Sequence, residues 1–114
     1  MIKNSHKLKY ITEADSTIEE AWTKIEVNMH RSVIIVDKGR VVGTLSDGDL
    51  RKAMLARRLL STLVKEVMNT HFIFLTKEEV SKAGKIFAKR DIFLIPVVDK
   101  NMRLLDLCVS PLSR

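Results

Sequence analysis

Residues 43–52, GTLSDGDLRK, form the segment whose residue types best suit chemistry. An apolar run ends here and a helix-forming run follows, so the segment predicts a helix N-terminus. The unpaired backbone N–H groups and the positive dipole end at such a terminus favour an anion. The Ser46 hydroxyl can donate to a phosphate. The Asp49 carboxylate, one helical turn further on, can accept two hydrogen bonds from the neighbouring hydroxyls of a ribose. Together these side chains suit a nucleoside phosphate.

The same two residues also have a structural interpretation. A Ser-x-x-Asp sequence at a helix start can form a capping box, in which the two side chains only satisfy backbone donors. The spacing of Ser46 and Asp49 leaves both interpretations open, and the organisation of the whole chain favours the ligand.

An internal repeat organises the chain. At an offset of 62 residues, VIIVD (33–37) falls on IPVVD (95–99). One extra residue in the following turn moves the offset to 63, so that RVV (40–42) falls on RLL (103–105). Each copy has the pattern of a short strand, a helix and a two-stranded hairpin, that is, β-α-β-β.

Apolar periodicity places these elements. Short strands are expected at 9–12 and 72–75, and the apolar runs 33–36 and 94–98 lack alternation, which predicts strands buried on both faces. The expected apolar stripes of the helices are Ile18, Ala21, Trp22, Ile25 and Met29 in copy one and Val80, Ala83, Phe87 and Ala88 in copy two. Copy one continues into a further helix with Leu50, Ala53, Met54 and Arg57 on one side. Copy two lacks this helix, and we expect the chain to be a fragment of a longer protein.

The repeat and the motif together resemble paired cystathionine-β-synthase (CBS) domains. The residues that carry the resemblance are hydrophobic-Pro-Val-Val-Asp, a turn, and hydrophobic-hydrophobic-Gly-x-hydrophobic-Ser-x-x-Asp, within residues 8–109. The resemblance implies an α/β (α+β) fold with two β-α-β-β(-α) repeats, at 1–62 and 63–114, packed with pseudo-twofold symmetry. It also implies clefts that hold AMP, ADP, ATP or S-adenosylmethionine.

Carried over residue by residue, the resemblance implies ribose at Asp49 and phosphate or ribose at Ser46. Adenine is expected against the start of the second strand and against the first strand. The full expected ligand-binding set is Ser46, Asp47, Asp49, Thr12, Val33, Ile34, Arg31 and Arg51, the two arginines facing phosphate. In copy two the motif positions of Gly43, Ser46 and Asp49 hold Asp106, Val109 and Leu112. We therefore expect one working site at most.

A narrower resemblance concerns the segments TLSDGDLRKAML and LVKEVMN. They are similar to CBS pairs attached to sugar-nucleotide transferases or sugar-phosphate isomerases, and IPVVDKNMRLLDL leans towards the first group. The implied function is a regulatory adenine-nucleotide-binding module that controls an attached or partner enzyme. The alternative is a purely structural dimerisation module without a ligand. A homodimer is expected in either case.

Other functions are disfavoured by what the sequence lacks. No nucleophile–base pair, phosphate loop or GxGxxG is present, so neither catalysis nor a cofactor is expected. His6, His30 and His71 lie too far apart for a metal site. Basic residues are dispersed among acids despite the net charge of +6, which argues against nucleic acid, and no apolar run is long enough for a membrane span. The single cysteine, Cys108, fits a cytoplasmic protein.

Overall fold

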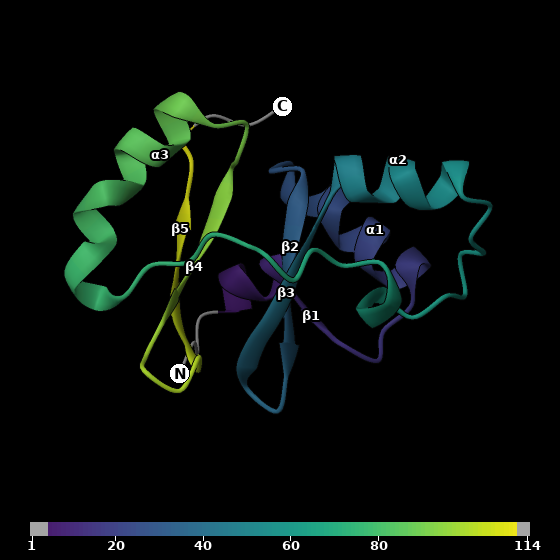
Figure 1. Ribbon diagram of the computed structural model, residues 1–114, viewed down its shortest axis with the longest axis horizontal. Coiled ribbons are helices and arrows are strands. Elements are labelled where there is room, and N and C mark those ends of the chain that lie inside the picture. Colours follow the sequence, from purple (N-terminus) through teal and green to yellow (C-terminus); the bar gives the residue numbers. More distant parts are fainter. Residues whose placement is uncertain (1–4, 112–114) are drawn as a thin grey trace.

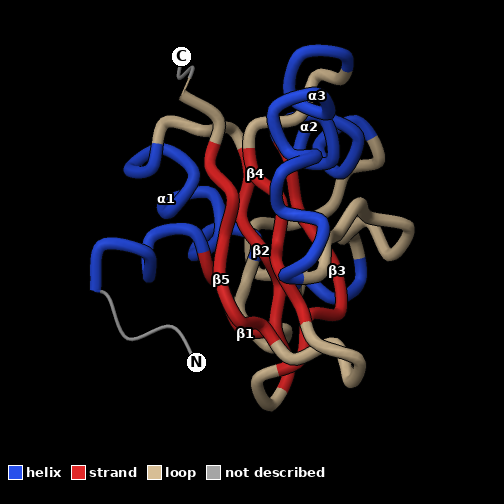
Figure 2. The backbone as a smooth tube through the Cα atoms, turned by 90° about the vertical axis from the view of Figure 1, so that its left-hand side faces the viewer, coloured by secondary structure: helices blue, strands red, loops and turns tan. Residues whose placement is uncertain are grey.

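Two small β-sheets lie face to face between two layers of helices (Figure 1). The computed structural model describes residues 5–111. The elements are η1 (Ser5–Tyr10), β1 (Ile11–Glu13), α1 (Ile18–Asn28), β2 (Ser32–Asp37), β3 (Arg40–Ser46), α2 (Asp47–Leu55), η2 (Val64–Glu66), η3 (Lys77–Lys82), α3 (Ala83–Lys89), β4 (Leu94–Val98) and β5 (Leu104–Val109), where η denotes a 3-10 helix. Figure 2 shows the strands of both sheets running in roughly one direction through the middle of the molecule.

The first sheet has the order β1-β2-β3, with β1 parallel and β3 antiparallel to β2. The second sheet pairs β4 with β5 antiparallel. The strand expected at 72–75 is reduced to one parallel bridge between Leu75 and Val97. The strand expected at 9–12 lies at 11–13, because η1 occupies the residues before it. Each copy thus keeps the predicted β-α-β-β order in a mixed α+β fold.

The apolar residues of β2 and β4 are buried on both faces, as their unbroken apolar sequences predict. Val33 and Ile35 enter a core that the first sheet shares with α1 and α2. Ile34 and Val36 enter the core between the two sheets. On the far side of β4, Ile95 packs against α3 in a third core. Because consecutive residues of a strand point to opposite faces, only an apolar run can serve two cores.

The two hairpins share their irregularities. Each ladder shifts register once, between Ile35 and Val36 in copy one and between Val97 and Val98 in copy two. These positions are related by the offset of 62 that the sequence predicts. The repeat is therefore confirmed at the level of the backbone.

The two hairpin turns differ by one residue. Lys38 and Gly39 form the first turn, both at positive φ (53° and 82°), which is the geometry of a two-residue type I′ turn. The second turn is one residue longer and places Met102 at φ 65°. This extra residue changes the offset from 62 to 63.

Two hydrogen bonds join the hairpins to each other. The Val41 N–H donates to the Met102 carbonyl at 2.8 Å, and the Leu104 N–H donates to the Gly39 carbonyl at 3.0 Å. Val41 corresponds to Leu104 in the repeat, and Gly39 corresponds to Met102. Each bond is therefore the other's counterpart, as a twofold contact between like surfaces requires, and the pseudo-twofold packing is confirmed.

Two residues expected on helical stripes lie past the ends of their helices. Met29 is the C-cap of α1, at φ 62°, and its side chain is 44% exposed. Arg57 follows the C-cap of α2, also at φ 62°, and is exposed. The periodic stripe predicts neither helix end, because both ends are set by a residue in the left-handed conformation.

The helical stripe of copy two is also partly wrong. Residues 77–82 form a 3-10 helix, and its three residues per turn rotate the stripe. Val80 is 40% exposed as a result, and Ala88 is exposed while Ile86 packs against the third core. The connector at 60–69 is as expected, with a short helical turn anchored by Val64 in the first core.

Candidate functional site

Ser46 is the N-cap of α2 and forms a capping box with Asp49. Ser46 Oγ accepts a hydrogen bond from the Asp49 N–H at 3.2 Å. Asp49 Oδ2 accepts from the Ser46 N–H at 2.9 Å and from the Ser46 hydroxyl at 3.0 Å. Within residues 5–111, Asp49 Oδ1 receives no hydrogen bond. The structural interpretation of the motif is thus realised, and one carboxylate oxygen remains available to a ligand.

The first turn of α2 also leaves one backbone donor without a partner. The Asp47 N–H donates to the Arg31 carbonyl at 2.9 Å, and the Asp49 N–H is used by the capping box. The Gly48 N–H makes no hydrogen bond to any described residue. A side-chain carbon at position 48 would lie 3.6 Å from Ser46 Oγ and 3.8 Å from an Arg51 guanidinium nitrogen. Three donor groups therefore surround one point at the positive end of the helix.

This helix end opens into a cleft of about 610 Å³. Its walls come from both halves of the chain: residues 30–32 and the β3–α2 junction from copy one, the connector at 69–73, and residues 90–94 from copy two. Three arginines and three aspartates line it, so their formal charges balance. The charged side chains are Arg31, Arg51, Arg90, Asp47, Asp49 and Asp91.

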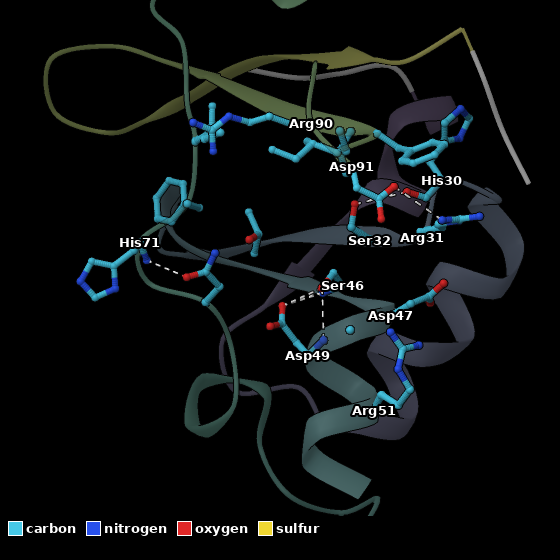
Figure 3. A pocket seen from close by; sticks show the side chains of 18 residues that line it. His30, Arg31, Ser32, Ser46, Asp47, Asp49, Arg51, His71, Arg90 and Asp91 are labelled. Carbon is cyan, nitrogen blue, oxygen red and sulfur yellow. Dashed lines mark hydrogen bonds and ion pairs between the residues drawn. The ribbon is translucent and has the colours of Figure 1, made fainter. Parts of the chain in front are cut away.

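The polar side chains are distributed unevenly along the cleft (Figure 3). Ser46 and Asp49 lie near the centre of the view. Arg31, Asp47 and Arg51 lie on one side of them. His71, on the connector, lies on the other side, where the aromatic ring of Phe72 and the side chain of Ile73 also line the cleft. One end of the cleft thus suits an anion, and the other end suits a flat apolar ring.

The CBS domain family model matches residues 4–56. Residues 4–56 are a CBS domain. No curated protein matches the chain in sequence. The chain as a whole has the fold of a CBS domain pair, because it superimposes on solved structures of such proteins at TM-scores of about 0.7.

Three of these structures illustrate the likeness. A CBS domain protein from Pyrobaculum aerophilum, complexed with AMP, has a TM-score of 0.70 at 21% identity over 87% of this chain and 78% of that chain. The CBS domain pair of protein MJ0100, complexed with 5′-methylthioadenosine and S-adenosyl-L-methionine, has a TM-score of 0.69 at 24% identity over 88% and 80%. A CBS domain pair/ACT domain protein from Thermotoga maritima has a TM-score of 0.71 at 22% identity over 89% and 80%. CBS domain pair proteins are generally regulatory, and this chain is likewise a module and not an enzyme.

Five of the eight residues expected to bind a ligand line the cleft of this CBS pair. They are Ser46, Asp47, Asp49, Arg31 and Arg51. The other three do not reach it as side chains: Thr12 is 3% exposed, and Val33 and Ile34 are fully buried in the cores. They belong to strand positions that pack against helices or the opposite sheet, so adenine contact through their side chains is a correction to the expected site.

Residues 90–94 and 69–73 were missed as cleft walls. Arg90, Asp91 and Phe93 follow α3 and face the cleft from copy two. In the repeat, 90–94 corresponds to 28–32, where Arg31 was expected. Applying the pseudo-twofold relation to both copies would have found these residues, since one cleft needs a wall from each copy.

Gly43 is required by the connector that crosses β3. A side-chain carbon there would lie 2.5 Å from Met68 Sδ and 3.1 Å from the Asn69 carbonyl. Asn69 pairs with Thr44 through two backbone hydrogen bonds, of 2.8 and 3.0 Å. The glycine of the motif therefore lets the connector pack against the strand that leads to Ser46, which holds the second wall of the cleft in place.

The corresponding region of copy two is built differently. Asp106, in place of Gly43, forms an ion pair with Lys7 of η1. Burial acts to raise the pKa of Asp106, but hydrogen bonds from Lys7 and from the Leu107 N–H lower it. Val109 stands where Ser46 stands in copy one, and Leu112 lies outside the described residues. Copy two thus offers an apolar side chain where the CBS motif has its hydroxyl.

His30 occupies the space beside this second junction. Its Nε2 lies 3.1 Å from the Ser110 carbonyl, and its Nδ1 lies 2.7 Å from the Asn28 carbonyl and 3.2 Å from the Tyr10 hydroxyl. These contacts tie the end of β5 to the end of α1. Burial raises the pKa of the Tyr10 hydroxyl, so this residue is a neutral partner.

Two further searches cover the described part of the chain. Among residues 5–111, no group of three or more His, Cys, Asp or Glu side chains is arranged to hold a metal ion. No helix in the same range is long and apolar enough to cross a membrane.

Proposed function

We propose that this chain is a regulatory module that binds an adenine nucleotide in the cleft beside Ser46 and Asp49. The observation that carries the proposal is the position of the Ser46–Asp49 capping box. It faces a cleft of about 610 Å³ at a helix N-terminus, with a spare carboxylate oxygen and a spare backbone N–H. Proteins of the same fold were solved with AMP and with S-adenosyl-L-methionine, which supports an adenosine-containing ligand.

The proposed arrangement follows from the chemistry of the two ends. The ribose hydroxyls donate to Asp49 Oδ1, and the Ser46 hydroxyl and the Gly48 N–H contact phosphate. The base lies toward the apolar end, against Phe72 and Ile73. We retain a single site per chain, because Val109 supplies no hydrogen-bonding side chain in copy two.

Regulation would follow from the cleft being shared. We propose that residues 1–62 and 63–114 act as two repeats and that a ligand between them changes their relative position. A ligand shifts such an equilibrium only by its differential affinity for the two states, and coupling of about 1–3 kcal/mol suffices. The regulated partner would be an attached or separate enzyme, with a sugar nucleotidyltransferase as the specific proposal, and the module would act as a cytoplasmic homodimer.

A purely structural dimerisation module is the second candidate. Two observations favour it: the capping box is complete without a ligand, and Leu55 and Leu59 are 82% and 71% exposed at the end of α2. Exposed apolar side chains that lie together often mark an interface. This candidate predicts a dimer whose stability does not respond to any adenine ligand.

Thermal unfolding separates the two candidates. The melting temperature is measured with 1 mM AMP, ADP, ATP or S-adenosylmethionine for the wild type and for Asp49→Ala. A ligand at about 100 times its dissociation constant adds about 2.7 kcal/mol to the free energy of unfolding, a shift of several degrees. The proposal requires a shift in the wild type that Asp49→Ala loses. An unchanged wild-type melt with all four ligands would leave the dimerisation module as the better account.

A further inference from the structure

Arg31 is held at the edge of the cleft by two contacts with copy two. Its guanidinium lies 4.9 Å from the centre of the Phe93 ring, and its Nη1 lies 3.7 Å from Asp91 Oδ1. Both contacts cross the pseudo-twofold boundary between the copies. Arg31 and Phe93 are themselves counterparts in the repeat, so the stack lies close to the pseudo-twofold axis.

Neither contact uses the full hydrogen-bonding capacity of Arg31. Its Nε is buried and has no hydrogen-bond partner among the described residues. Its ion-pair partner Asp91 is 86% exposed at the side chain, and Arg31 itself is 43% exposed. An exposed ion pair at this distance is weak. A guanidinium presents several donors in one plane, and a phosphate with its three terminal oxygens is the ligand that satisfies them best.

Arg51 completes the same end of the cleft. Its guanidinium lies beside Gly48, and within residues 5–111 no ion pair is formed by Arg51. Figure 3 shows Arg31 and Arg51 on the same side of Ser46. Asp47 lies there as well, and its carboxylate limits the net positive charge, so phosphate binding at this end depends on both arginines.

We propose that Arg31 and Arg51 hold the phosphate of the nucleotide and that Asp91 competes with this phosphate for Arg31. The inference rests on the proposed function and deepens it. The cleft would select phosphorylated adenosine over adenosine itself, which lacks the anion, and over S-adenosylmethionine, which carries a positive sulfonium near that position. Asp91 is an internal competitor that a phosphate displaces.

The competition gives the nucleotide a way to act on copy two. Asp91 lies between α3 and β4, whereas Arg31 lies between α1 and β2. When the phosphate takes the Arg31 guanidinium, the ion pair between the copies is lost. Occupancy of the cleft is thereby converted into a change at the boundary of the two repeats, which is the differential contact that regulation by a ligand needs.

Calorimetric titration with AMP and with adenosine tests the inference on four proteins: wild type, Arg31→Gln, Asp91→Asn and the control Glu78→Gln. The control removes one exposed carboxylate charge, as Asp91→Asn does, but outside the cleft lining. The wild type should bind AMP at least tenfold more tightly than adenosine. Arg31→Gln should weaken AMP binding about tenfold and leave adenosine binding unchanged. Asp91→Asn should tighten AMP binding about two- to fivefold, with adenosine and the control unaffected.

The outcomes separate the two levels of the account. If Asp91→Asn leaves AMP affinity unchanged or weakens it, or if Arg31→Gln weakens AMP and adenosine equally, the competition is refuted while the nucleotide site stands. If neither AMP nor adenosine binds the wild type, the proposed function fails and this inference fails with it. A gain of affinity in Asp91→Asn cannot arise from misfolding, so the decisive variant is insensitive to that complication.

Discussion

Arg40 and Arg103 form an antiparallel bridge where the two hairpin turns meet, and each is the other's counterpart in the repeat. The backbone hydrogen bonds on either side of them are likewise related in pairs. The turn of each hairpin must therefore hold its shape for the two sheets to join. In the first turn this depends on Gly39, at φ 82°.

The same substitution should have opposite effects at two glycines. A side-chain carbon would meet no atom within 4 Å at Gly39 or at Gly84, so sterics do not distinguish them. Gly39→Ala should lower the free energy of unfolding by about 1 kcal/mol, because alanine is strained at positive φ. Gly84→Ala in α3 should raise it by about 0.5–1 kcal/mol. Urea denaturation measures both, and a stabilising Gly39→Ala would show that the turn geometry is wrong.

Thr12 should be replaceable by valine with a gain in stability. Its side chain is 3% exposed, and within residues 5–111 no hydrogen-bond partner is found for its Oγ1. A buried hydroxyl without a partner costs about 1–3 kcal/mol, so Thr12→Val should raise the free energy of unfolding by about 1 kcal/mol. Thr17→Val, which removes the N-cap hydroxyl of α1, should lower it by about 1 kcal/mol.

The Thr12 variant also tests the original expectation that this residue binds the ligand. Thr12→Val should leave the affinity for AMP unchanged, because the buried side chain does not line the cleft. A marked loss of AMP affinity in a stably folded Thr12→Val protein would restore Thr12 to the site.

The end of α2 offers a second stabilising change. The Arg58 N–H donates to the Ala53 carbonyl at 3.0 Å and the Arg57 N–H to the Met54 carbonyl at 2.9 Å, which is a Schellman motif with Arg57 at the left-handed position. Arg57→Gly should raise the melting temperature by the equivalent of about 1 kcal/mol. Arg58→Gly, one residue later, carries no such strain and should not stabilise. Equal effects at the two positions would contradict this geometry.

Stability should fall in acid through two capping boxes. Backbone and hydroxyl hydrogen bonds from Thr17 lower the pKa of Glu20 below its ordinary value of 4.5, and those from Thr76 do the same for Glu79. A pKa lowered by folding contributes stability above the ordinary value, and this contribution is lost as pH falls through the folded-state pKa. The free energy of unfolding should therefore decline below about pH 4.5.

The double variant Glu20→Gln/Glu79→Gln should flatten this acid decline, because glutamine keeps the capping geometry but does not titrate. Glu78→Gln, next to Glu79 but outside the capping box, is the matched control and should keep the wild-type slope. Chemical denaturation at a series of pH values between 3 and 6 measures the three slopes. Identical slopes in all three proteins would remove the capping boxes from the explanation.

Much of this structure could be predicted because the sequence is written twice. The common offset predicts the two hairpins, and unbroken apolar runs such as 33–36 predict strands between two cores. The Ser46–Asp49 spacing predicts the helix start. In each case a local pattern determines a local structure.

What could not be predicted depends on long-range packing or on single backbone conformations. Val80 turns outward because its segment winds as a 3-10 helix, and periodicity does not distinguish this from an α-helix. Val33 and Thr12 were expected in the cleft but belong to the interior of the sheet, where the strand pairing decides their direction. Asp91 and Arg90 reach the cleft only because copy two folds back against copy one.

The central claim is one adenine-nucleotide site per chain, at Ser46 and Asp49, and calorimetric titration of AMP into the wild type and Asp49→Asn tests it most directly. Asparagine keeps the size of the side chain but loses the charge that the ribose hydroxyls and the capping box use. The account predicts one AMP per chain in the wild type and at least tenfold weaker binding in Asp49→Asn. Two AMP molecules per chain, or equal affinity in the two proteins, would contradict it.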